Sequence, residues 1–135
     1  MFDNLDGRRF YDPAVFYAQS KLANALFAKE LSRRLGDRGI AVNSVDPGSA
    51  RTRLSKGRVA RLFMKSAEQA AATQALLAAS PLAAGITGEY WRDCKISPDH
   101  AMLDDTALAS RLWQVSQEIV DRDRFAGPQP LQRAA

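Results

Sequence analysis

A short apolar run at residues 40–45 constrains the fold more than any other part of this sequence. The run reads Ile-Ala-Val-Asn-Ser-Val, is rich in β-branched residues and lacks a regular polar alternation. Such a run is typical of a strand in a parallel sheet that is covered on both faces. Because a long helical segment precedes it, the order of elements predicts an α/β fold with a parallel sheet.

The first helix is expected to start at Asp12-Pro13, because aspartate is a preferred N-cap and proline suits the first helical turn. Its apolar residues then recur at three-to-four-residue spacing, and Gly36 and Gly39 end the pattern. The predicted core face of this helix consists of Leu22, Leu26, Phe27, Leu31 and Leu35.

The remaining elements follow from capping signals and apolar periodicity. The capping-box sequence at residues 66–69 predicts a helix that runs to about Ala79 and stops at Ser80-Pro81. Residues 88–94 are expected to form a second strand, with Trp91 in the core. Asp104-Asp105 starts a last helix, and the residues from Phe125 onward are expected to form a frayed tail. Its apolar stripe is Leu108, Leu112, Val115 and Ile119.

Composition favours one soluble globular domain over residues 1–135, with 46% hydrophobic and 25% charged residues. No apolar run approaches the ~20 residues of a membrane span, and the start lacks the regions of a signal peptide, so a cytoplasmic location is expected. With a lone Cys94 and a single histidine, neither an internal disulfide nor a metal site is expected. Cys94 is interpreted as a small buried hydrophobe.

The net charge is +4, but most basic residues are scattered among acids, which gives no reason to expect a nucleic-acid partner. The segment from Ser49 to Lys65 differs, because it contains six basic residues and no acidic one. Two interpretations stay open: a solvated loop, or an amphipathic lid that faces an apolar substrate and contacts a membrane surface weakly. The apolar residues of such a lid would be Leu54, Val59, Leu62, Phe63 and Met64.

Tyr17 and Lys21 stand four residues apart in the first helix, so they lie on one helix face. An adjacent cation favours the phenolate over the phenol, which suits Tyr17 to general acid/base chemistry. Taken by itself, the spacing also fits an exposed pair of side chains without a function.

The sequence around this pair is recognisable. Over nearly the whole chain it resembles the C-terminal half of the short-chain dehydrogenase/reductase family, in particular its retinol dehydrogenase and WW-domain oxidoreductase-like branch. The resemblance implies a Rossmann-like, doubly wound parallel sheet. It rests on the Tyr17/Lys21 pair together with residues 20–24, 26–31, 46–48, Thr52, 88–95 and 112–113.

The resemblance also implies roles for particular residues. Tyr17 would exchange a proton with the substrate hydroxyl or carbonyl, and Lys21 would bind the nicotinamide ribose of NAD or NADP. Pro47, Gly48 and the main chain near Ala50 would meet the carboxamide, with Thr52 at the same end of the cofactor. An ordinary Pro-Gly turn is the alternative for this segment. The substrate would be an apolar small-molecule alcohol or carbonyl.

Two features of the family are not found in these residues: a serine on the strand before the catalytic helix and a glycine-rich phosphate-binding loop. Residues 1–16 contain no serine or threonine. We therefore expect the chain to represent a C-terminal half without the N-terminal cofactor-binding half, and to be inactive in isolation.

Uncovered sheet edges would favour aggregation or a homo-oligomer. The alternative function is a non-catalytic remnant that serves as an interaction module.

Overall fold

The computed structural model describes residues 2–49, 64–98 and 101–126. Within them it contains three α-helices and a small mixed sheet, so the predicted α/β class is confirmed at this level. The helices and strands, in chain order, are α1 (Pro13–Leu35), β1 (Ser44–Asp46), α2 (Ala67–Ala79), β2 (Tyr90–Arg92), β3 (Lys95–Ile96) and α3 (Thr106–Ala126). Short 3₁₀ helices lie at Phe2–Asn4, Gly36–Arg38, Pro81–Ala83 and Ala101–Asp104, and the last is labelled η5.

The helix starts agree with the sequence analysis because their signals are local. The Asp12 carboxylate accepts a hydrogen bond from the Val15 backbone N–H at 2.9 Å, and Pro13 is the first helical residue of α1. Ser66 and Gln69 form both hydrogen bonds of a capping box at the start of α2. The N-caps of α1 and α2 are therefore confirmed.

The sheet has the order β1-β2-β3. The predicted parallel pairing is present, with Val45 opposite Trp91 and Asp46 opposite Arg92. β3 runs antiparallel to β2 and was not predicted. The connecting turn places two consecutive non-glycine residues, Asp93 and Cys94, at φ values of 52° and 60°, the left-handed geometry of a tight hairpin.

The bounds of β1 correct the prediction of a strand over residues 40–45. Side chains supply part of the bonding of the earlier residues. The Val42 carbonyl accepts from the Gly88 backbone N–H at 2.7 Å, but the Val42 N–H donates to the Thr87 hydroxyl at 2.9 Å, and the Asn43 side-chain amide donates to the Ile86 carbonyl at 2.8 Å. Ile40 is 49% exposed, and the three β1 residues are half-buried. The expectation of a strand buried on both faces is therefore wrong for the described residues. β2 is likewise shorter than the strand predicted over residues 88–94.

Cys94 also departs from its prediction. It is half-buried in the hairpin turn, and its backbone N–H donates to the Thr73 hydroxyl oxygen at 3.0 Å. Thr73 is buried on α2, so this bond ties the hairpin to that helix.

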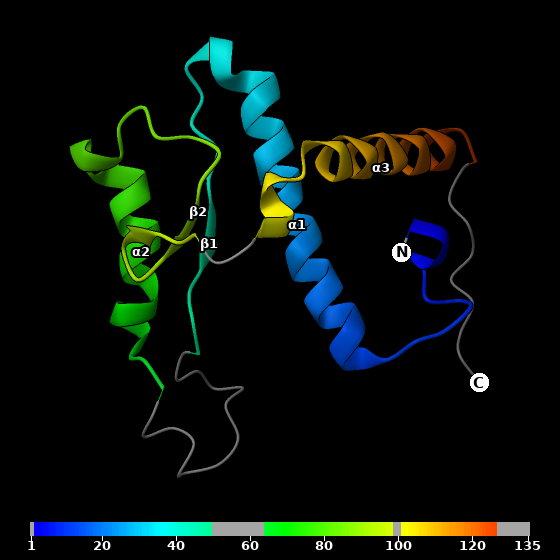
Figure 1. Ribbon diagram of the computed structural model, residues 1–135, viewed down its shortest axis with the longest axis horizontal. Helices are drawn as coiled ribbons and strands as arrows, with labels where there is room; N and C mark the ends of the chain where they lie inside the picture. The colour runs from blue at the N-terminus through cyan, green and yellow to red at the C-terminus, as the bar shows by residue number, and fades with distance from the viewer. Residues whose placement is uncertain (1, 50–63, 99–100, 127–135) are drawn as a thin grey trace.

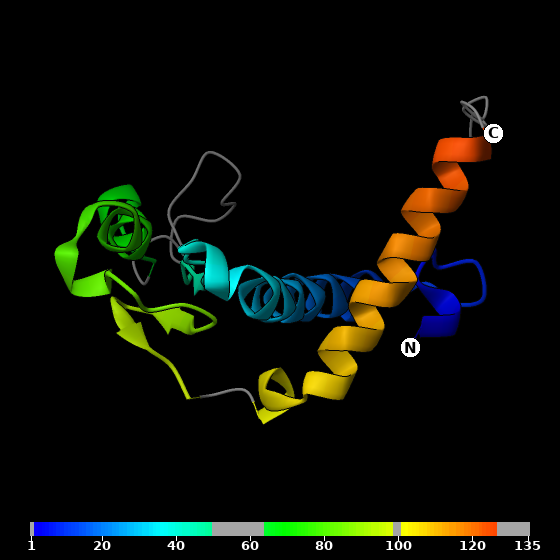
Figure 2. The same ribbon diagram turned by 90° about the horizontal axis from the view of Figure 1, so that it is seen from above.

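Figure 1 shows β1 and β2 between α2 and α1, while α3 crosses α1 on the side away from the sheet. Figure 2 shows the same crossing of α1 and α3 from above. The main buried cluster lies where these two helices meet η5. It consists of Ala25, Leu26, Leu103, Ala109 and Leu112.

Only part of the predicted apolar face of α1 is buried. Leu26 belongs to the cluster, whereas Phe27 is exposed on one side and stacks on Trp113 with ring centroids 5.1 Å apart. The Arg34 guanidinium lies 4.5 Å from the Trp113 ring centroid. Trp91, in contrast, is buried in the sheet as predicted.

A buried carboxylate lies at the same helix crossing. Glu30 is 2% exposed, and its oxygens accept hydrogen bonds from Arg33 at 2.6 Å and Arg34 at 2.9 Å. The Ser110 hydroxyl of α3 donates to the same carboxylate at 3.3 Å. Glu30 therefore links α1 to α3 through a charged network.

Candidate functional site

The predicted catalytic pair lies in the second and third turns of α1, close to the helix start that the Asp12 cap fixes. The Lys21 Nζ lies 5.3 Å from the centroid of the Tyr17 ring, above its face. The predicted i,i+4 contact is therefore present, as a cation–π arrangement. The Tyr17 side chain is 66% exposed, so its hydroxyl is accessible to a small molecule.

Ser20 lies between these two residues in sequence. Its hydroxyl donates to the Tyr17 carbonyl at 2.8 Å, which is the usual backbone bond of a helical serine. This contact is local to the helix.

The Pro47-Gly48 turn follows β1 directly. Gly48 has a φ of +67°, a conformation that side chains other than glycine rarely adopt. The Asp46 carboxylate accepts from the Gly48 N–H at 2.8 Å and from the Arg92 Nε at 2.9 Å. These contacts fix the backbone of the turn relative to β2.

Asp46 is held in its ionised form by these partners. The Gly48 N–H, and then the hydrogen bond and charge of Arg92, lower the pKa of the Asp46 carboxyl, while partial burial opposes this shift. The turn therefore has a charged anchor at neutral pH.

The two predicted parts of the site lie toward the same end of the fold. Figure 1 shows that β1 runs in the opposite direction to α1, so the carboxyl end of β1 is at the end where α1 begins. Ligands bind outside the carboxyl ends of strands in open α/β sheets, and the turn after β1 is at such a position. Ala50 and Thr52, the other predicted cofactor residues, lie outside the described residues.

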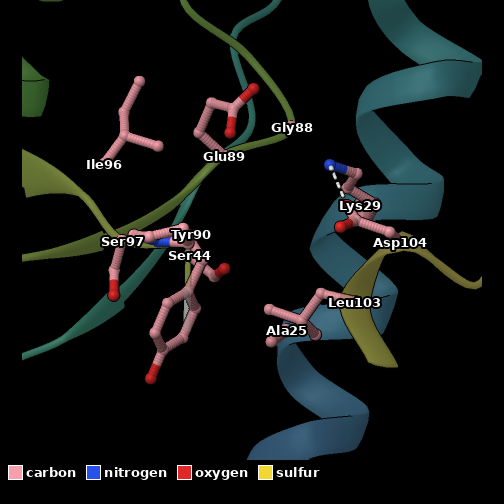
Figure 3. Close-up of a pocket in the computed structure, with 11 residues that line it drawn as sticks. Ala25, Lys29, Ser44, Gly88, Glu89, Tyr90, Ile96, Ser97, Leu103 and Asp104 are labelled. Carbon is pink, nitrogen blue, oxygen red and sulfur yellow. Dashed lines mark ion pairs between the residues drawn. The ribbon is translucent and has the colours of Figure 1, made fainter. Parts of the chain in front are cut away.

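A pocket of about 240 Å³ lies elsewhere, between α1, the strands and η5. Figure 3 shows Lys29 and Asp104 at its α1 side, where their charged groups are 3.7 Å apart, and Tyr90 on the sheet side. None of the predicted site residues lines it. The pocket therefore does not bring the predicted residues together.

The sequence analysis missed the residues that hold the turn. Arg92 pairs with Asp46 because the strand register places them opposite each other, and Lys65 lies against the same turn. No signal along the chain gives the strand register on which this pairing depends. The Lys65 contact depends on a non-local approach that sequence spacing does not encode.

Among the residues that the structure describes, no group of three or more histidine, cysteine, aspartate or glutamate side chains could hold a metal ion. No helix in the described ranges is long and apolar enough to cross a membrane.

Comparison with known proteins identifies relatives of this chain. Human retinol dehydrogenase 14 is 34% identical over 88% of this chain and 39% of its own length. Short-chain dehydrogenase TIC 32 B, chloroplastic, from Brassica napus is 36% identical over 90% of this chain and 41% of its own length. Human retinol dehydrogenase 13 is 36% identical over 98% of this chain and 45% of its own length.

The chain spans about two fifths of the length of the curated relatives it matches. No family model matches the sequence. The identity of about one third extends over most of this chain in each of these relatives, which agrees with the resemblance seen in the Tyr17 and Pro47-Gly48 segments. By sequence, the chain is therefore a relative of the short-chain dehydrogenase/reductase family.

Proposed function

We propose that this chain carries the proton-transfer and nicotinamide end of an oxidoreductase site that interconverts an alcohol and a carbonyl. The observation that carries the proposal is the exposed Tyr17 ring with the Lys21 ammonium above it. The Pro47-Gly48 turn toward the same end of the fold, and the relationship to dehydrogenases, support it.

The residues at this end suit NAD or NADP. The Lys21 ammonium has three N–H donors for ribose hydroxyls, and the turn after β1 offers main-chain groups for a carboxamide. Ala50 and Thr52 would add contacts at the same end of the cofactor. A bound nicotinamide would supply or accept the hydride.

Tyr17 is the group that moves the proton. In the reducing direction its hydroxyl donates a proton to the carbonyl oxygen of the substrate, and in the oxidising direction its phenolate accepts the alcohol proton. The Lys21 ammonium lies over the Tyr17 ring, next to the group that exchanges the proton. The hydride and the proton together account for both hydrogens that distinguish the alcohol from the carbonyl.

We propose an apolar substrate, because relatives of this chain are named retinol dehydrogenases. We propose that the apolar side chains between Ser49 and Lys65 cover such a substrate. Of these, Leu54, Val59, Leu62 and Phe63 lie outside the described residues. Retinol and retinaldehyde are therefore suitable first probes.

The second candidate is a non-catalytic interaction module. It is favoured by three exposed aromatic residues around the start of α1, namely Phe10, Tyr11 and Tyr17. Exposed aromatic clusters are typical of surfaces that bind other proteins.

A chimera separates these two functions. In it, this chain replaces the matching segment of human retinol dehydrogenase 14, which supplies the remainder of that protein's length. Reduction of retinaldehyde with NADH or NADPH would support the oxidoreductase proposal. The loss of NADH or NADPH absorbance measures this reaction. A folded chimera that binds the cofactor without turnover would contradict it and favour the interaction module.

A further inference from the structure

Lys65 lies beside the Pro47-Gly48 turn, although it stands 17 positions after Gly48 in the sequence. Its Nζ donates to the Pro47 carbonyl at 3.4 Å, and its backbone N–H donates to the Ser49 carbonyl at 2.9 Å. A Cβ placed on Gly48 would lie only 2.8 Å from the same Nζ. The ammonium therefore contacts Pro47 and occupies the space that a side chain at residue 48 would need.

The same ammonium forms an ion pair with Asp93 in the β2–β3 hairpin turn. The hairpin turn is held to α2 by the hydrogen bond between the Cys94 N–H and the Thr73 hydroxyl. Lys65 thus connects the turn after β1 to an anchored part of the fold. Its side chain is 28% exposed, so the ion pair is partly shielded from solvent.

Asp46 and Arg92 form a second link of opposite charges between the same two chain segments. The Asp46 link holds the amide of Gly48, whereas the Lys65 link holds the carbonyl of Pro47. The two links therefore fix opposite sides of the peptide group that joins Pro47 to Gly48. A peptide group that is held on both sides keeps one orientation, whereas a peptide group held on one side only can rotate.

We propose that Lys65 is a positioning residue, which holds the Pro47-Gly48 peptide in the orientation that meets the nicotinamide. The inference rests on the proposed function, because the orientation of this peptide affects chemistry only when a nicotinamide binds against it. The ion pair with Asp93 also gives this lysine of the basic segment a partner within the fold.

Amide hydrogen exchange of this chain, followed by NMR, tests the contact without any cofactor. In Lys65→Met, the Gly48 N–H should exchange about fivefold faster, as expected when a half-exposed ion pair of ~1 kcal/mol is lost. Lys65→Arg should restore slow exchange, because it keeps the charge. Lys95→Met, an exposed lysine on β3, is the matched control and should leave Gly48 exchange unchanged. Unchanged Gly48 exchange in Lys65→Met would overturn the proposal.

The second readout is steady-state kinetics in the retinol dehydrogenase chimera. Lys65→Met should raise the cofactor KM about fivefold and leave kcat within about twofold, with Lys65→Arg close to the unsubstituted chimera. Faster Gly48 exchange with an unchanged cofactor KM would refute the link to nicotinamide binding. A chimera without turnover before any substitution would contradict the proposed function, while the exchange experiment alone would still decide whether Lys65 holds the turn.

Discussion

Replacing Glu30 with glutamine tests how α1 and α3 are held together. Glutamine keeps the shape of the side chain and can still accept from Ser110, but it loses the charge that Arg33 and Arg34 face. The side chains of both arginines are about half exposed, so each ion pair is discounted to about 0.2–1 kcal/mol. For the two pairs together we therefore expect the free energy of unfolding to fall by about 0.4–2 kcal/mol.

The same variant has a defined pH dependence. Burial alone would raise the pKa of Glu30, but the hydrogen bonds and charges of Arg33 and Arg34 outweigh it and lower the pKa below its usual 4.5. A carboxylate whose pKa is lowered by folding stabilises the fold above the unfolded pKa, and this contribution is lost as the pH falls through the folded pKa. The difference between the unsubstituted chain and Glu30→Gln should therefore be constant near neutral pH and shrink below about pH 4.5.

Urea unfolding followed by tryptophan fluorescence measures this difference, because Trp113 stacks on Phe27 at the same helix crossing. Glu118→Gln is the matched control, since Glu118 is an exposed glutamate on α3 and its replacement should change stability by less than ~0.5 kcal/mol. Equal effects of the two substitutions at neutral pH, or a Glu30 effect that grows in acid, would refute the reasoning.

Three further predictions concern the candidate site and the basic segment. Gly48→Ala should destabilise the chain by about 1–2 kcal/mol in urea unfolding, because of its positive φ and the nearby Lys65, whereas Gly36→Ala, which meets nothing within 4 Å, should not. Asp46→Asn should lower the free energy of unfolding at neutral pH, and the difference from the unsubstituted chain should disappear as the pH falls below the usual aspartate pKa of 3.8. A stability difference that does not depend on pH would contradict the charged anchor. Vesicle co-sedimentation should show that residues 49–65 favour phosphatidylserine over phosphatidylcholine, with a preference that fades with salt; equal binding would leave the solvated-loop interpretation.

Sequence reasoning succeeded where the determining interactions are local. The Asp12 cap of α1 and the Ser66 capping box of α2 each depend on hydrogen bonds within three residues. The Tyr17–Lys21 contact depends on helix periodicity alone, so its geometry could also be predicted.

It failed where structure depends on distant partners. β1 begins only at Ser44, and before it side chains take part in the bonding: the Val42 N–H donates to the Thr87 hydroxyl, and the Asn43 side chain bonds the backbone of residues 86 and 89. The apolar pattern does not reveal these bonds. β3 was missed because Asp93 and Cys94 adopt left-handed conformations without the glycine that normally signals such a turn. The pairing of Asp46 with Arg92 follows from strand register, which spacing along the chain does not specify.

The most direct test of the proposed function compares two tyrosine substitutions in the retinol dehydrogenase chimera. Tyr11 is 64% exposed, close to the 66% of Tyr17, and lies just before the same helix, so Tyr11→Phe is a matched control for Tyr17→Phe. Tyr17→Phe should lower turnover by about 10²–10⁴-fold with cofactor affinity nearly unchanged, because the ring stays and only the proton donor is lost. Lys21→Ala should weaken both turnover and cofactor binding, and Tyr11→Phe should change neither. Retention of more than about a tenth of the turnover rate in Tyr17→Phe would contradict the assignment of Tyr17 as the general acid/base.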